Sequence, residues 1–193
     1  MDIQRIENNW ETFTQVLGRL NDDNIGLMLD SLGERIAACP SSMKIDQPGC
    51  HPGGLVENSL EVTSVMRSLN DALDYGYQIQ SLIKVGLLHD IGKIGNLEKE
   101  YFLPQESEWH REKLGQMFIY NPDLQKMSVT HRTLYILQNF GVSLSEEEWI
   151  AIQISSGTHF EENRFYVGSE PTLALCLSHA KQIVNHRHLS RNN

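Results

Sequence analysis

The feature that most constrains this chain is the apolar stretch over residues 79–91. At about 100° per residue, its apolar side chains leave a helix almost no polar face. A helix that is apolar all round is a buried helix. At its end the sequence places His89 and Asp90 side by side, with Lys93 three residues further on. The stretch therefore predicts a central buried helix that carries polar side chains into the core.

The His89–Asp90 pair needs a physical explanation, because a charge inside a core costs several kcal/mol unless it is paired or bound to a metal. One explanation is a metal site, since imidazole and carboxylate are usual ligands for zinc, iron and manganese. The other is a hydrogen-bonded core histidine beside an aspartate that caps the glycine turn. The setting Leu-Leu-His-Asp-Ile-Gly-Lys, at the end of a buried helix, favours the metal site.

This heptapeptide resembles the central motif of the HD superfamily of metal-dependent phosphohydrolases. Residues 51–60 (His-Pro-Gly-Gly-Leu-Val-Glu-Asn-Ser-Leu) are similar to the segment in which that family carries its first ligand. Residues 177–181 (Leu-Ser-His-Ala-Lys) are similar to the end of the family motif. The resemblance spans residues 32–184. It implies an all-α domain in which a histidine, the His-Asp pair and a late aspartate hold a metal.

Two of the four ligand positions that the resemblance implies are replaced in this chain. Asn58 stands where the family pattern has histidine, and Lys181 stands where it has aspartate. Asparagine is a poor ligand for borderline metals, and a charged ammonium has no lone pair to offer. A further segment, residues 152–157, is similar to one with a histidine or aspartate before glycine, and here it has Ser155 and Ser156.

Other histidines are candidates to complete the site. His51 lies in a Gly/Pro turn seven residues before Asn58, and His110 matches the position of a second-metal histidine in the family. The expected site is a divalent metal (zinc, manganese, magnesium or iron) held by His89 and Asp90, as the resemblance implies, with His110 and His51 as substitute ligands. A chain without metal is the alternative, and we expect His51 or His110 to share a cleft with His89.

The position of Lys181 gives a sharper expectation. Apolar side chains of the last helix form an arc, and Lys181 lies at the edge of that arc. A buried Asp90 without a metal would be an uncompensated charge, which is costly. We therefore predict that the Lys181 ammonium occupies or borders the metal position and pairs with Asp90.

Three functions follow from these residues and from the resemblance. The first is hydrolysis of a phosphoester such as a nucleotide, in which a metal held by His89 and Asp90 activates water and Lys93 steadies the phosphate. The second, from a different class, is a catalytically silent binding or scaffold module that keeps the fold and the cleft. The third is a di-iron oxygenase, and the missing ligands count most strongly against it.

Composition limits the partners. The chain has 16 Lys and Arg against 25 Asp and Glu, a net charge of −9, so coating of nucleic acid has no electrostatic support. A small phosphorylated ligand needs only a few local cations. Three cysteines without paired spacing predict free thiols in a reducing compartment. No apolar run reaches transmembrane length, so we expect a cytoplasmic protein, with its oligomeric state left open.

The domain organisation follows from helical spacing and from breaks at proline, glycine and asparagine. We expect one all-α domain over residues 1–193, with an N-terminal helical extension (1–31), an HD-like core (32–184) and a polar tail (186–193). Seven or eight helices and no strand ladder are expected. The expected helices cover residues 4–20, 25–39, 55–69, 78–91, 106–120, 128 or 130 to 140, 145–154 and 171–185.

Overall fold

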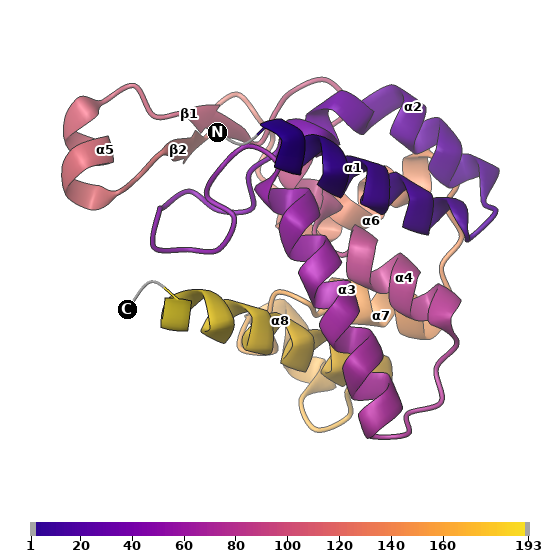
Figure 1. Cartoon of the computed structure of the whole chain (residues 1–193). Helices are drawn as coiled ribbons and strands as arrows, with labels where there is room; N and C mark the ends of the chain where they lie inside the picture. Colours follow the sequence, from indigo (N-terminus) through magenta and orange to yellow (C-terminus); the bar gives the residue numbers. More distant parts are fainter. Residues whose placement is uncertain (1–2, 192–193) are drawn as a thin grey trace.

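The computed structural model describes residues 3–191, and over this range the chain is mostly α-helical (Figure 1), as predicted. Two short strands pair as an antiparallel ribbon. Within residues 3–191 no helix combines the length and apolar character needed to cross a bilayer. The elements in chain order are α1 Ile3–Gly18, α2 Asp23–Ala38, α3 Gly54–Ala72, α4 Ile79–Leu88, the 3₁₀ helix η1 Ile91–Ile94, β1 Phe102–Pro104, α5 Glu108–Leu114, β2 Phe118–Tyr120, α6 Val129–Asn139, α7 Glu146–Gln153, the 3₁₀ helix η2 Glu161–Tyr166 and α8 Thr172–Arg191.

Local capping residues explain where several helices begin. Ser145 and Glu148 form the predicted capping box at α7, each side chain accepting a backbone N–H of the other residue. Asp22 caps α2 by accepting the N–H of Asn24, and Ser128 caps α6 in the same way. Pro171 lies just before α8, where its missing N–H costs nothing. Short-range chemistry therefore sets these boundaries.

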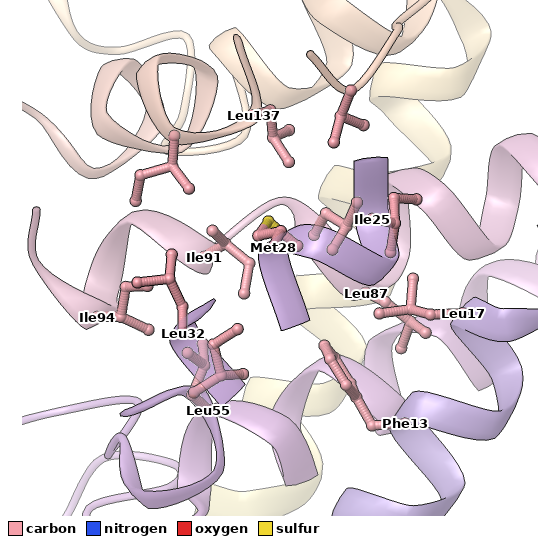
Figure 2. Packing of buried hydrophobic residues seen from close by; sticks show 14 of the residues in the cluster. Phe13, Leu17, Ile25, Met28, Leu32, Leu55, Leu87, Ile91, Ile94 and Leu137 are labelled. Atoms are coloured by element: carbon pink, nitrogen blue, oxygen red, sulfur yellow. The ribbon is translucent and has the colours of Figure 1, made fainter. Parts of the chain in front are cut away.

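Helix α4 is central because its apolar side chains serve two hydrophobic clusters. Ile83, Leu87 and Leu88 belong to a first cluster built with α1, α2, α3, η1 and α6. Figure 2 shows Leu87 among residues of these elements. Leu82 and Val85 belong to a second cluster built with α3, α7 and α8. The prediction of a buried central helix over this stretch is confirmed. Its C-terminal end, where the polar residues begin, is thereby fixed between both halves of the bundle.

The turn after α4 is held against α6 by a close backbone approach. A Cβ at Gly92 would lie 2.2 Å from the Val129 carbonyl oxygen and 2.8 Å from the Thr133 nitrogen. Thr133 Oγ1 donates to the His89 carbonyl at 3.1 Å and accepts the Gly92 N–H at 2.9 Å. These contacts leave the two residues between them, Asp90 and Ile91, with little freedom to move.

One predicted helix, residues 106–120, is confirmed only in its first half. Helix α5 ends at Leu114, and Gly115 then adopts a left-handed conformation with φ of 61°, which favours glycine and ends the helix. The chain continues as β2, which pairs with β1 in the register Phe102 with Tyr120. The expectation of no strand ladder is therefore corrected. Figure 1 shows α5 and the ribbon projecting from the helical body.

The predicted polar tail, residues 186–193, is also corrected in part. Helix α8 continues to Arg191, and residues 192–193 lie outside the described range. One reason is an interaction that the sequence pattern does not show: the His188 Nε2 atom lies 3.1 Å from Glu61 Oε2 on α3. Contact with α3 thus supports this last part of α8.

Gly92→Ala is expected to lower the free energy of unfolding by about 2 kcal/mol, because forcing a methyl group into a tight contact costs roughly 1–3 kcal/mol. Urea denaturation followed by circular dichroism measures the change. Gly26→Ala in α2 is the matched control, since a Cβ there meets no atom within 4 Å and alanine favours a helix. Equal stability of the Gly92 variant and the parent chain would contradict the prediction.

Candidate functional site

The candidate site is built around Asp90, which lies between α4 and η1 and is 4% exposed. The preceding residue, His89, is fully buried. Both residues are placed by the end of α4, whose apolar side chains hold that end in the core. The sequence prediction of a polar pair at the end of a buried helix is therefore confirmed, and the partners of the pair decide what it can do.

Lys93 is the first partner of the Asp90 carboxylate. It lies three residues further on, which in the tight η1 turn brings its side chain to the same side. Its Nζ lies 2.7 Å from Asp90 Oδ2 and donates to Ser41 Oγ at 3.2 Å. Ser41 comes from the loop after α2, where its backbone N–H donates to the Gly49 carbonyl at 2.8 Å. This ammonium therefore joins η1 to the loop over residues 39–53.

Lys181 is the second partner of Asp90, and it comes from the far end of the chain, on α8. Its Nζ lies 3.4 Å from Asp90 Oδ1 and donates to the Ser155 carbonyl at 3.0 Å. The predicted ion pair between Lys181 and Asp90 is confirmed. That the ammonium stands in the position of a metal stays a prediction. Each oxygen of the carboxylate thus faces its own ammonium group.

The charges of this cluster follow from burial and from the neighbouring groups. Burial opposes ionisation of Asp90, but the Lys181 and Lys93 ammonium groups together outweigh it and hold the pKa of the carboxyl well below its usual range. Burial lowers the pKa of Lys181, while the Asp90 charge acts in the opposite direction. Asp90 is therefore a carboxylate at neutral pH.

His89 is a neutral histidine with a defined tautomer. Its Nδ1 lies 2.9 Å from the Gly86 carbonyl oxygen, which can only accept, so Nδ1 carries the proton. Burial lowers the pKa of His89 to about 4, although the Asp90 charge opposes the shift. Its Nε2 is then a buried lone-pair acceptor without a hydrogen-bond partner, 3.6 Å from Asp90 Oδ2.

A cavity of about 360 Å³ opens over this cluster. It brings together five residues that the sequence singled out: Asn58, Asp90, Lys93, Ser156 and Lys181. The Asn58 Oδ1 atom is buried and has no hydrogen-bond partner. The cavity also contains residues that sequence reasoning missed: Ser41, Ser42, Gln47, Pro48, Val129, Thr130 and Asn185.

Neither His51 nor His110 lines this cavity, contrary to the expectation that one of them would share a cleft with His89. His51 is exposed, lies 3.6 Å from a carboxylate oxygen of Glu57, and lines a different cavity near α1. His110 lies in the projecting α5, where its Nδ1 is 2.7 Å from Ser107 Oγ. Sequence position alone did not show that the segments carrying His51 and His110 lie away from the cavity over Asp90.

The residues around Asp90 do not fit a resident metal. Among residues 3–191 no three His, Cys, Asp or Glu side chains come together in a group that could hold a metal ion. His89 and Asp90 supply two ligands, whereas a catalytic zinc site typically has three protein ligands and a water. A divalent cation bound to Asp90 would also lie beside the Lys93 and Lys181 ammonium groups, which repel it.

The chain matches no family model, no curated protein and no solved structure. The site must therefore be interpreted from its own geometry. That geometry is a buried carboxylate held between two ammonium groups, under a cavity lined by hydroxyl and amide groups.

The neutral, buried state of His89 predicts a dependence of stability on pH. Its folded pKa, about 4, lies below the ordinary value of 6.5, so the unfolded state takes up the proton first as the pH falls. The resulting loss of stability is absent at neutral pH and grows as the pH falls below about 6.5. From about pH 7 to about pH 5 the free energy of unfolding should fall by roughly 2 kcal/mol.

Urea denaturation at both pH values measures this loss. His89→Asn is the test variant, because its amide keeps a donor for the Gly86 carbonyl but does not titrate. The variant should lose distinctly less stability than the parent chain over the same pH range. Identical losses would show that burial of His89 is not the cause.

The two lysines should stabilise the fold cooperatively, because removal of one lysine still leaves the other as a counter-charge for Asp90. Lys93→Met and Lys181→Met are each expected to lower the free energy of unfolding by about 1–2 kcal/mol. The double variant leaves a buried, unpaired carboxylate and should lose roughly 3–5 kcal/mol, more than the sum of the single changes. Chemical denaturation of all four chains gives this double-mutant cycle, and strict additivity would contradict the shared pairing.

Proposed function

We propose that this chain is a metal-independent binding module of the HD-like type, whose cavity takes a small phosphorylated ligand. The observation that carries the proposal is the position of two ammonium groups on the two oxygens of Asp90. A lysine ammonium is a common phosphate-binding group. The same two groups make the carboxylate unsuitable for a divalent cation.

The charge of the cavity supports an anionic ligand. Its charged lining residues are Lys93, Lys181 and Asp90, which sum to one positive charge in a chain of net charge −9. An ammonium has three N–H groups, and two on each lysine are used by protein acceptors. One N–H on each lysine is thus left for a ligand. A low-dielectric cavity strengthens such charged contacts.

Binding is tested by calorimetric titration of the purified chain with inorganic phosphate and with phosphate monoesters. Saturable binding to the parent chain and its loss in Lys181→Gln would support the proposal. Lys113→Gln, at an exposed lysine on α5, is the matched control and should bind like the parent chain. No binding by the parent chain, or equal binding by the Lys181 variant, would contradict the proposal.

A second candidate is metal-dependent hydrolysis of a phosphoester, and one observation favours it. His89 Nε2 is a buried acceptor without a partner, 3.6 Å from Asp90 Oδ2, and Asn58 Oδ1 is a further unpartnered acceptor. A cation would satisfy such acceptors. For this candidate the purified chain must contain zinc, manganese, magnesium or iron and must lose hydrolysis in His89→Ala.

We predict that the parent chain binds no stoichiometric metal and hydrolyses phosphodiesters and nucleotides weakly or not at all when divalent metals are added. Asn58→His combined with Lys181→Asp should bind about one metal ion per chain, because it rebuilds the four-ligand set that the family resemblance implies. Elemental analysis after dialysis measures the metal. A metal-loaded parent chain with robust turnover would reverse the order of the two candidates.

A further inference from the structure

Beyond Lys93, Lys181 and Asp90, most residues that line the cavity carry neutral hydrogen-bonding groups, and these come from five parts of the fold. Hydroxyl groups come from the loop after α2, from α6 and from the segment after α7, and amides come from that loop, α3 and α8. These residues are Ser41, Ser42, Gln47, Asn58, Thr130, Ser156 and Asn185. We propose that the ligand is a phosphorylated polyol or sugar, an inference that rests on the proposed phosphate binding.

The lining offers no support for a nucleobase. None of the lining residues, all of which belong to the described part of the chain, has an aromatic side chain. Binding sites for bases commonly use aromatic rings or arginine planes for stacking. Pro48 and Val129 are the two apolar residues among those that line the cavity. A ligand made of hydroxyl groups fits such a lining better than a flat, apolar ring.

Asn58 gives an independent reason for a hydroxylated ligand. Its Oδ1 is buried, has no partner and belongs to a side chain that lines the cavity. Leaving a buried acceptor unpaired is costly, so a donor is expected opposite it. The ionised oxygens of a phosphate can only accept, whereas a sugar hydroxyl can donate to an amide oxygen or accept from an amide nitrogen. A hydroxyl therefore satisfies Asn58 in either orientation of its amide.

Together these contacts divide the cavity into two parts. Lys93 and Lys181 bind the phosphate. The polyol part of the ligand is neutral, so the two ammonium groups do not repel it. Asp90 adds a specific requirement, since its charge disfavours any further anionic group on the ligand. Asn58 and the serine and threonine hydroxyl groups bind the ring or chain hydroxyls. The expected ligand is thus a monophosphate with several hydroxyl groups and without a second acidic group.

The test is a calorimetric titration of the full chain with glucose 6-phosphate, glycerol 3-phosphate, AMP, inorganic phosphate and glucose. One of the two polyol phosphates should bind at least about tenfold more tightly than AMP and inorganic phosphate. Asn58→Leu should remove this preference. Asn139→Leu, at an exposed position on α6, is the matched control and should keep the preference.

The outcomes separate this inference from the proposed function. If AMP or inorganic phosphate binds as tightly as the polyol phosphates, the inference is wrong and phosphate binding stands. If no phosphate compound binds, the proposed function fails and the inference fails with it. The headgroup of an inositol phospholipid carries the same chemistry, so vesicles containing phosphatidylinositol are included. Binding to the vesicles as well as to a soluble polyol phosphate would support the ligand class and add a lipid surface as its source, whereas binding to the vesicles alone would contradict the inference.

Discussion

The contact on which the site depends is the pairing of one buried carboxylate with two ammonium groups. Asp90 lies at the end of a helix whose apolar residues serve both hydrophobic clusters, so the carboxylate cannot move to solvent. Lys93 then links it to the loop after α2, and Lys181 links it to α8 and to the Ser155 carbonyl. The Asp90 carboxylate thereby connects segments that lie far apart in the chain. Separating them would leave a buried charge unpaired, which is costly.

Much of the fold could be predicted from the sequence because its signals are local. The apolar stretch at α4, the capping box at Ser145 and the proline before α8 each act within one or two helical turns. The projecting part could not be predicted in the same way. Trp109 and Met117 have the spacing of a buried helical face, but both are exposed, and Gly115 ends the helix. Ribbon formation depends on pairing with β1, which residue spacing does not reveal.

The site could be predicted where a buried charge, the Asp90 carboxylate, required a partner of opposite charge. Asp90 had to be compensated, and Lys181 lies at the edge of the apolar arc and at a ligand position of the resemblance, so their pairing followed from charge and position together. Ser41 and the position of His51 could not be inferred, because both depend on the path of the loop over residues 39–53. The backbone of that loop is set by turns and by contacts with β2, which have no periodic signature.

The two replaced ligand positions have a common physical consequence. In the arrangement that the resemblance implies, two carboxylates and a divalent metal sum to zero charge. In this chain Asp90 and Lys181 also sum to zero, while Asn58 and the buried His89 are neutral. Loss of the metal would thus leave the core electrically balanced, and the fold need not weaken. Lys93 then adds one positive charge beyond this balance, and on the proposed interpretation this surplus charge attracts a phosphate to the cavity.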